Sequence, residues 1–576
     1  MRQDILADRP ALLRWDRASV RRPPRSRVLA LSGFVAVAVL VAVGIVGYRV
    51  VNQSGSTPAT AAAAPHFIDV TTSSGLAHTY NGSAAYDVGG GVAAFDCNDD
   101  GKPDIYMAGG ENPASLYRND SRIGGDLKFT ALHDPATDLT GATGAYPIDI
   151  DGDGNVDLVV LRIGETEILR GLGNCRFERA NSAWTFDGGN AFATAFSAKW
   201  ESSAALPALA VGHYRKLDSS GKPTLDCDTS EIARSKADGT GYDRPIALSP
   251  GYCTLSMLFS DWDLSGRRDL RVTNDKNYYS SGTDQLWRVA EGQPPTVYSD
   301  ADGWVSMQIF GMGIAGWDVN GDGYPDYYLT SQGDNKLQTL TAGPNQPTFR
   351  DIASKRGVNA AAPFTGGDVL PSTAWHPEFQ DVNNDGFVDL FVSKGNIGGQ
   401  ADFATKDPND LLLGQPDGGF KEAADAAGVL NYERGRGAAL ADFNLDGLLD
   451  LVEVNYGTPA RLWRNAGLGD AAAPAPMGGW IALRATEPGP NRDAVGGWID
   501  VKVGDRTVQR ELTIGGGHAG GQLGWAHFGL GAASSAQVRV RWPDGGVGPW
   551  VQVAANGFYY LDRGAANARS WSPTQP

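Results

Sequence analysis

Six short segments of the chain carry aspartates at one fixed spacing. The first is Asp96-Cys97-Asn98-Asp99-Asp100-Gly101-Lys102-Pro103-Asp104, and the others begin at Asp149, Asp261, Asp318, Asp381 and Asp442. All follow the pattern D-x-[DN]-x-[DS]-G-x-x-D, and we call them the aspartate loops, each named by its first residue. Side-chain oxygens at positions 1, 3, 5 and 9, with the main-chain carbonyl at position 7, suit Ca²⁺. The glycine at position 6 permits the sharp turn around an ion.

The aspartate loops predict up to six structural Ca²⁺ sites. The predicted ligand residues, with position 7 offering its carbonyl oxygen, are Asp96, Asn98, Asp100, Lys102, Asp104, Asp149, Asp151, Asp153, Asn155, Asp157, Asp261, Asp263, Ser265, Arg267, Asp269, Asp318, Asn320, Asp322, Tyr324, Asp326, Asp381, Asn383, Asp385, Phe387, Asp389, Asp442, Asn444, Asp446, Leu448 and Asp450. The Asp261 loop has Ser265 at position 5, so we expect weaker binding there. Acidic surface turns are the alternative interpretation, but they do not explain one spacing in six places.

Much of the negative charge of the chain is concentrated in these loops. The formal net charge is −17, and because residues 1–27 carry +5, the remainder carries −22. Nineteen carboxylates stand at predicted ligand positions, and without cations they would repel one another. We therefore expect a chelator to destabilise the protein. We expect no nucleic-acid partner, because phosphate binding needs clustered Lys and Arg.

The aspartate loops mark a repeat. Their starts are separated by 53, 112, 57, 63 and 61 residues, and the interval of 112 predicts a further unit near residue 200. Positions 1, 3, 5 and 9 of that unit are Trp200, Ser202, Ala204 and Ala208, so we expect a strand there but no metal. Four short strands per period predict an all-β fold, a seven-bladed β-propeller with six calcium-loop blades and one degenerate blade.

The two ends of the repeat region predict how the ring closes. The last unit lacks the Phe-led segment that ends other units, as at residues 349–358 and 420–429. A matching segment, Phe67-Ile68-Asp69-Val70-Thr71-Thr72-Ser73-Ser74-Gly75-Leu76, precedes the first unit. We predict that residues 66–77 pair into the last blade, which removes an exposed sheet edge. Small residues before the loops, such as Gly89-Gly90-Gly91, are expected where strands crowd a central axis.

An apolar run of 21 residues, 28–48, is long enough to span a bilayer as a helix. The eight Arg before it place the N-terminus in the cytoplasm and the bulk of the chain in the periplasm or outside the cell. A cleaved signal peptide is the alternative. The predicted organisation is a cytoplasmic tail (1–27), a membrane anchor (28–48), a flexible linker (49–65), the propeller (66–468), a small β-domain (470–565) and a tail (566–576).

The four cysteines offer structural pairs. Cys227 and Cys253 flank one insertion and could form a disulfide in an oxidising compartment, while a pair of Cys97 with Cys175 is the weaker prediction. Buried free thiols are the alternative for all four. The sequence holds no C-x-x-C metal pair.

The aspartate loops resemble the FG-GAP/VCBS repeats of integrin-α-like β-propellers, over residues 66–468. In that family Ca²⁺ stiffens the blades while other loops bind ligands, so the resemblance implies a structural metal. Residues 470–565 resemble the ASPIC/UnbV domain of the cartilage-acidic-protein-like family. The matching motifs are Asn491-Arg492-Asp493-Ala494-Val495-Gly496, Gly515-Gly516-Gly517, His527-Phe528-Gly529-Leu530-Gly531 and Val538-Arg539-Val540-Arg541-Trp542-Pro543-Asp544-Gly545. The family usually reads Ile-Gly-Ala where this chain has Val495-Gly496-Gly497. The resemblance implies exported proteins with matrix or adhesion roles.

The sequence contains no G-x-S-x-G, H-E-x-x-H or P-loop motif. We therefore expect a non-enzymatic, membrane-anchored scaffold that binds a protein or glycan partner through loops away from the metals, or through the C-terminal domain. One alternative is a hydrolase or lyase acting on polysaccharide in the central channel, with His376 and Glu378 as candidates. Another is an accessory subunit of an envelope or biosynthetic assembly. Packed, structural roles are the simpler interpretation of His376, His518 and His527.

Overall fold

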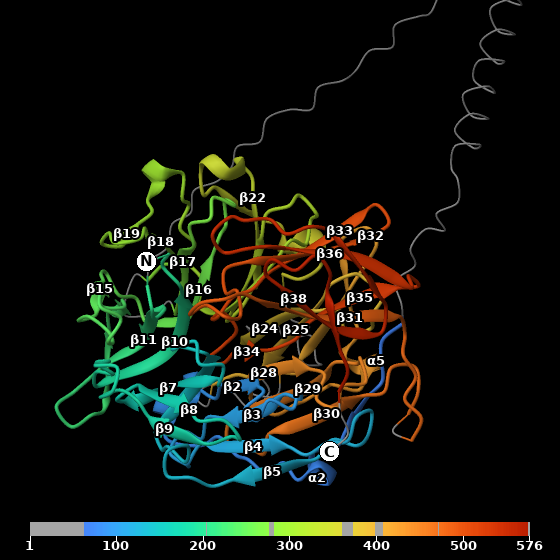
Figure 1. The fold of residues 1–576 in the computed structure, drawn as a ribbon. Helices are drawn as coiled ribbons and strands as arrows, with labels where there is room; N and C mark the ends of the chain where they lie inside the picture. Colours follow the sequence, from blue (N-terminus) through green and yellow to red (C-terminus); the bar gives the residue numbers. More distant parts are fainter. Residues whose placement is uncertain are drawn as a thin grey trace, which may run out of the picture. The chain divides into compact units, whose positions relative to one another are not determined.

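The computed structural model describes residues 63–202, 204–275, 282–359, 373–397, 407–470 and 472–573, and these residues form mainly β-strands (Figure 1). The predicted all-β class is confirmed. The predicted anchor, residues 28–48, lies outside the described residues. Within the described ranges, no helix has the length and apolar character needed to cross a bilayer.

From Phe67 to Asn465 the strands form antiparallel sets of four, and the second and third sets are joined into one eight-stranded sheet by the pairing of Ala191 with Gly164 and of Phe192 with Ile163. In chain order the sets are β2 (Val92–Phe95), β3 (Asp104–Met107), β4 (Ser115–Asn119) and β5 (Phe129–Leu132); β6 (Ala142–Ile148), β7 (Asp157–Gly164), β8 (Glu167–Gly171) and β9 (Phe177–Arg179); β10 (Ala191–Lys199), β11 (Ala208–His213), β14 (Ser230–Ala233) and β15 (Ile246–Leu248); β16 (Thr254–Ser260), β17 (Asp269–Asn274), β18 (Gln285–Arg288) and β19 (Thr296–Val297); β20 (Gly311–Trp317), β21 (Asp326–Ser331), β22 (Lys336–Leu340) and β23 (Phe349–Asp351); β24 (Ala374–Gln380), β25 (Asp389–Lys394), β26 (Asp410–Gly414) and β27 (Phe420–Glu422); and β28 (Gly435–Ala441), β29 (Asp450–Asn455) and β30 (Arg461–Asn465) with β1 (Phe67–Asp69).

The predicted pairing of the two ends is confirmed. β1 lies antiparallel to β30, with Phe67 opposite Asn465 and Asp69 opposite Trp463. The Phe-led segments share one local structure, in which a short strand leads into a single helical turn: α2 (Thr71–Ser74), α3 (Ala353–Arg356) and α5 (Ala424–Ala427). Each turn ends at a glycine with φ between 81° and 88°, a left-handed conformation that glycine adopts without steric cost. This explains the glycine that the sequence repeats at this position.

Neighbouring sets pack on one another through buried apolar side chains. Ile105 and Tyr106 of β3 lie in one cluster with Leu158 and Val160 of β7. A further hairpin, β12 (Arg215–Leu217) with β13 (Pro223–Cys227), lies in the insertion between β11 and β14. Both disulfides are formed, Cys97 with Cys175 and Cys227 with Cys253.

The C-terminal part forms two further four-stranded sheets, which we call the C-terminal module. One sheet holds β31 (Gly479–Thr486), β35 (Ala526–Gly531), β38 (Gly557–Asp562) and β39 (Arg569–Trp571), and the other holds β32 (Trp498–Val503), β33 (Arg506–Glu511), β36 (Ser535–Arg541) and β37 (Val551–Ala554). The two predicted strands, at 498–503 and 538–542, are present as β32 and β36. The strand β39, which lies beyond the predicted boundary at residue 565, pairs with β38.

Candidate metal centres

Each aspartate loop joins the first strand of a set to its second strand. The loops link β2 to β3, β6 to β7, β16 to β17, β20 to β21, β24 to β25 and β28 to β29, and the position-9 aspartate is always the first residue of the second strand. Residues 200–207 occupy the same place between β10 and β11, and Ala208 begins β11, as the repeat spacing predicts. The hairpins therefore bring the predicted ligands of each loop together locally.

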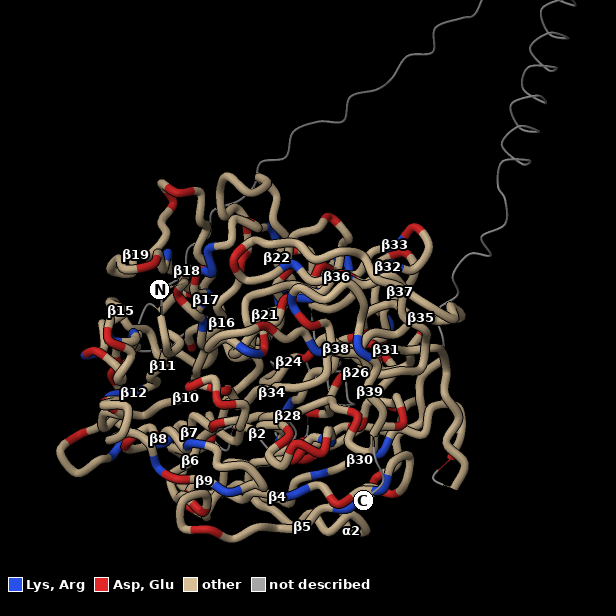
Figure 2. Tube along the Cα trace, in the orientation of Figure 1, with Lys and Arg blue, Asp and Glu red and all other residues tan. Residues whose placement is uncertain are grey.

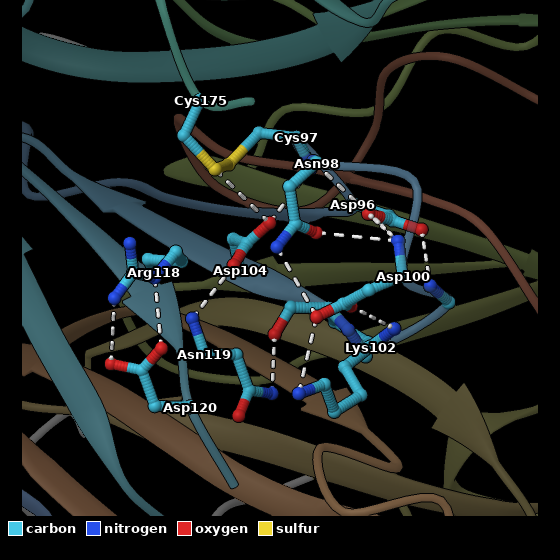
Figure 3. Close-up of a disulfide and its surroundings, with 12 residues drawn as sticks. Asp96, Cys97, Asn98, Asp100, Lys102, Asp104, Arg118, Asn119, Asp120 and Cys175 are labelled. Atoms are coloured by element: carbon cyan, nitrogen blue, oxygen red, sulfur yellow. Dashed lines mark hydrogen bonds and ion pairs between the residues drawn. A yellow bond between two sulfur atoms is a disulfide. The ribbon is translucent and has the colours of Figure 1, made fainter. Parts of the chain in front are cut away.

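The six loops share one hydrogen-bonding pattern, shown for the Asp96 loop in Figure 3. The position-1 carboxylate accepts the main-chain N–H of the position-6 glycine, and the Asp96 Oδ2 to Gly101 N distance is 2.7 Å. The same bond measures 3.0, 3.0, 2.9, 2.7 and 2.7 Å in the loops that follow. The position-5 side chain accepts the N–H of position 7, as Asp100 does from Lys102 at 2.9 Å. The loops are therefore ordered alike, although their other residues differ.

The position-9 aspartates also accept main-chain hydrogen bonds, a role that the sequence does not reveal. Asp104 accepts the N–H of Cys97 and the N–H of Asn119, both at 2.7 Å, and so ties the loop to β4 (Figure 3). Asp157, Asp389 and Asp450 make the equivalent pair of bonds. Each carboxylate keeps lone pairs for a further partner. A metal role for position 9 stays a prediction, and the structure adds a role in joining the strands.

Several loop oxygens are buried without a partner. Asp149 Oδ1, Asp261 Oδ1 and Asn444 Oδ1 make no hydrogen bond, and oxygens of Asp149, Asp151 and Asp153 lie within 4.8 Å of one another. Burial, followed by the charge of Asp493, raises the pKa of Asp149 to about 7. Buried acceptors without a donor are costly, and a hard cation would supply the missing partner. The residues present therefore fit a divalent cation.

Basic side chains neutralise part of this charge, and Figure 2 shows acidic and basic residues interspersed along the trace. Arg170 lies 2.8 Å from Asp151 and 3.1 Å from Asp153. In the Asp261 loop, the guanidinium of Arg267 lies 3.2 Å from Asp263 and 3.0 Å from Asp269. The guanidinium of Arg267 thus reaches two predicted ligands of the loop that has Ser265 in place of a carboxylate, and weaker metal binding there stays a prediction.

The C-terminal module packs against the aspartate loops. Trp525 Nε1 donates to Gly101 O at 3.2 Å, and His527 Nε2 lies 2.6 Å from Asn384 Oδ1. Arg268, in the Asp261 loop, donates to the carbonyl of Pro543 at 2.7 Å. A Cβ on Gly447 would overlap the ring of Trp480. The position-6 glycine of the Asp442 loop thus serves the packing of the module as well as the turn.

A segment of the module, residues 512–523, inserts among the first strands of the sets, and we call it the inserted segment. It forms bridges from Ile514 to Ala198 of β10, from Gly515 to Leu258 of β16, from Gly517 to Ile314 of β20 and from Gly520 to Ala145 of β6. Its strand β34 (Gln522–Leu523) lies parallel to β2. Because the inserted segment contacts the first strands of five sets, it lies where these strands converge.

The inserted segment explains small residues on both sides of the contact. A Cβ on Gly91 or Gly144 would overlap the carbonyl oxygen of Ala519, and one on Gly520 would overlap that of Val92. Crowding of strands, which the sequence predicts, therefore does not by itself account for these small residues. The only signal of the inserted segment in the sequence is the glycine run 515–517 with Gly520 and Gly521.

His376 and Glu378, the candidates for channel chemistry, both lie on β24 and make contacts within the protein. His376 Nε2 is 3.4 Å from Glu378 Oε2. Glu378 also accepts from Gln522 Nε2 at 2.7 Å, from Gln380 Nε2 at 2.8 Å and from Leu440 N at 3.1 Å. The pair borders a cavity of about 220 Å³, to which Arg510 of the module also contributes.

Comparisons with known proteins match both parts of the chain. A family model described as "FG-GAP-like repeat" matches residues 96–160, 318–392 and 381–453, and one described as "ASPIC and UnbV" matches residues 487–568. The FG-GAP matches include five aspartate loops and leave out the Asp261 loop.

Cartilage acidic protein 1 of Homo sapiens is 30% identical over 229 residues, covering 35% of this chain and 30% of that protein. The Xenopus tropicalis protein of the same name is 28% identical over 222 residues, covering 35% and 31%. The chain thus spans about a third of the length of these relatives. A solved structure of a hypothetical selenium-binding protein from Sulfolobus tokodaii matches at 13% identity and a TM-score of 0.39, covering 68% of this chain and 86% of that one. The chain carries FG-GAP-like repeats and an ASPIC and UnbV domain, and it is a distant homologue of cartilage acidic protein 1, which carries the same domains.

Proposed function

We propose that the protein is a calcium-binding, seven-bladed β-propeller that acts as an extracytoplasmic scaffold for a protein or glycan partner, anchored to the membrane by residues 28–48. Seven strand sets among the described residues, closed by the pairing of β1 with β30, support the blade count. Two disulfides support an oxidising compartment. The relationship to cartilage acidic protein 1 supports an extracellular scaffold role.

The observation that carries the calcium proposal is the shared conformation of the aspartate loops together with their unpartnered oxygens. Asp149 Oδ1, Asp261 Oδ1 and Asn444 Oδ1 are buried acceptors with no hydrogen bond. When bound, Ca²⁺ would supply positive charge between the carboxylates. The chain's own residues order the loops through the bonds from position 6 to position 1. We expect the metal to be structural, because the C-terminal module packs on the loops.

The partner would bind at loops on the ends of the strands opposite the aspartate loops. The support is that the module already packs against the loops on the aspartate side. A scaffold is favoured over a channel enzyme because the inserted segment crosses the first strands, and Glu378 and His376 bond to it and to each other. The alternative functions, a polysaccharide hydrolase or lyase and an accessory subunit of an envelope assembly, have weaker support.

The test is binding of the purified full chain to immobilised glycans and matrix proteins, in calcium and in EDTA. A saturable, calcium-dependent interaction without turnover of the bound glycan is the expected result. Release of shortened glycan products by the wild-type chain, abolished in Glu378→Gln, would favour the enzyme instead. Deletion of residues 28–48 should move the protein from the membrane fraction to the soluble fraction, and retention in the membrane fraction would contradict the anchor.

A further inference from the structure

One sheet of the C-terminal module, formed by β32, β33, β36 and β37, has an apolar face and a polar face. The apolar face carries Ile499, Val501, Val538 and Val540, which are buried in one cluster with side chains of β31 and β35. Because successive side chains of a strand point to opposite faces, the residues between them lie on the other face. We call that face the polar platform and define it by Asp500, Lys502, Gln509, Arg539, Arg541 and Trp550.

A buried carboxylate organises the centre of the polar platform. Asp500 lies opposite Gln509 of β33 and Arg539 of β36, and it is 0% exposed. Its Oδ2 accepts Arg539 Nε at 2.7 Å, and its Oδ1 accepts Arg541 Nε at 3.2 Å. Gln509 Oε1 accepts Arg541 Nη2 at 3.1 Å. One buried anion thus fixes two guanidinium groups in place, so a ligand would find them already ordered.

Both guanidinium groups also stack on tryptophan rings and still reach the surface. The Cζ of Arg539 lies 4.4 Å from the ring centroid of Trp550, and that of Arg541 lies 4.8 Å from the ring of Trp498. The side chains of Arg539 and Arg541 remain 29% and 20% exposed, and Trp550 is 36% exposed. The contacts described use only part of the five N–H donors of each guanidinium, so donors remain for a ligand.

We propose that the polar platform binds an anionic polysaccharide, with Arg539 and Arg541 donating to its carboxylate or sulfate groups and Trp550 stacking on a sugar ring. The planar guanidinium fork matches such oxyanions, and the face of an indole ring offers a rigid apolar contact. A protein interface would have a core depleted of charged residues, whereas charged and amide side chains stand at the centre of this face.

The charge of the polar platform favours an anionic ligand over a neutral one. Lys502, Arg539 and Arg541 stand against the single carboxylate of Asp500, which leaves an excess of two positive charges. Residues 28–576 as a whole carry −22, so this excess is local. Glu511, on the same face at the propeller end, is bonded instead to Asp261 N and Ser260 Oγ. The inference rests on the proposed scaffold function and adds a ligand class and a surface other than the loops opposite the aspartate loops.

The test measures binding of the purified full chain to immobilised alginate, dextran sulfate and neutral dextran. The variants are Arg539→Gln and Trp550→Ala, with Arg569→Gln as the matched control. Arg569 belongs to the other sheet of the module, and its guanidinium likewise lies over an aromatic ring, 4.1 Å from the centroid of Tyr560, and 2.9 Å from a carboxylate, that of Asp562. Thermal unfolding of each variant reports whether it is folded, and the exposed Trp550 keeps the test valid if Arg539→Gln does not fold.

We expect the wild type to bind an anionic polysaccharide about tenfold or more tightly than dextran, and to bind it less tightly as salt rises. The arm that binds, alginate or dextran sulfate, distinguishes carboxylate from sulfate recognition. Arg539→Gln and Trp550→Ala should each weaken this binding about tenfold, as expected for loss of a charge-assisted hydrogen bond or a stacked ring. Arg569→Gln should bind as wild type.

Equal binding to dextran, or an equal loss in Arg569→Gln, would overturn the polar platform as a binding site. If the wild type binds a different glycan or matrix protein, and both platform variants retain that binding, the inference fails and the proposed scaffold function stands. A wild type that binds no glycan or matrix protein at all would overturn both.

Discussion

The main-chain N–H of His518 donates to Nδ1 of His376 at 3.1 Å, although the two residues are 142 positions apart in sequence. His376 lies on β24 among the propeller repeats, and His518 lies in the inserted segment of the C-terminal module. The ring of His518 also packs against Trp375, with centroids 4.9 Å apart. The bond shows that the module reaches the first strands themselves, so we expect the two parts to unfold together rather than as independent domains.

Because the inserted segment packs closely against Gly91, we expect one added methyl group at that position to lower the stability of the protein. Gly91→Ala should destabilise the protein by about 1–3 kcal/mol, because the added Cβ overlaps Ala519 O. Gly316→Ala, on the first strand β20, is the control, since its Cβ would meet its nearest neighbours at 3.7 Å. Urea unfolding measures both. Equal stability of the two variants would show that the segment does not pack against Gly91.

Burial of His518 predicts a loss of stability in acid. Burial, together with the charges of Arg436 and His376, lowers the pKa of His518 from 6.5 to about 3. The folded state therefore binds fewer protons than the unfolded state. The contribution of the neutral His518 side chain to the free energy of unfolding is fully present above pH 6.5 and is lost as the pH falls toward 3. At pH 5 the loss from this one group is about 2 kcal/mol.

Urea unfolding at pH 7 and pH 5 tests this prediction. His518→Asn should lose less stability than wild type between these two pH values. His133→Asn is the control, because the His133 side chain is 75% exposed, and it should follow the wild type. If His518→Asn and wild type lose the same free energy over this interval, the neutral buried histidine is contradicted.

The internal cation of the Asp261 loop predicts a calcium-dependent mutational effect. Arg267→Gln should destabilise the protein by about 1–3 kcal/mol in EDTA, because it leaves the buried Asp269 without its guanidinium partner. Calcium should reduce that loss by binding the freed carboxylates. Arg118→Gln, which removes an exposed pair with Asp120, should cost at most about 1 kcal/mol in either condition. An equal loss for Arg267→Gln with and without calcium would argue against a cation site in this loop.

Structural features that rest on a repeated sequence pattern could be predicted from the sequence, whereas features that occur once in the chain could not. The fixed spacing of the aspartates places the loops between first and second strands, even at Trp200, where the carboxylates are gone. The Phe67 segment matches the segments at Phe349 and Phe420, which end their own units. Because the last unit lacks such a segment, the match predicts the pairing of β1 with β30.

The inserted segment offers no such comparison. In the sequence, the glycines at 515–517 are typical of a flexible turn. In the structure, side chains of the propeller strands donate hydrogen bonds to carbonyl oxygens of this segment: Ser197 Oγ to Ile514 O at 2.6 Å, Tyr146 OH to Gly516 O at 3.1 Å and Ser256 Oγ to Gly517 O at 2.9 Å. The position of the turn around Asn491 is hidden for the same reason. Its motif predicts a turn, and only the packing of Val495 beside Ile150 places that turn over an aspartate loop. Contacts between residues hundreds of positions apart leave no periodic pattern.

Calcium binding by the full chain is the most direct test of the central claim, that divalent ions hold the aspartate loops so that the blades stay closed in a ring. We expect up to six bound Ca²⁺ per chain and a melting temperature that falls in EDTA and recovers with calcium, since each site adds about 2.7 kcal/mol at a free concentration one hundred times its Kd. A protein that binds no calcium and melts at the same temperature in EDTA would contradict it.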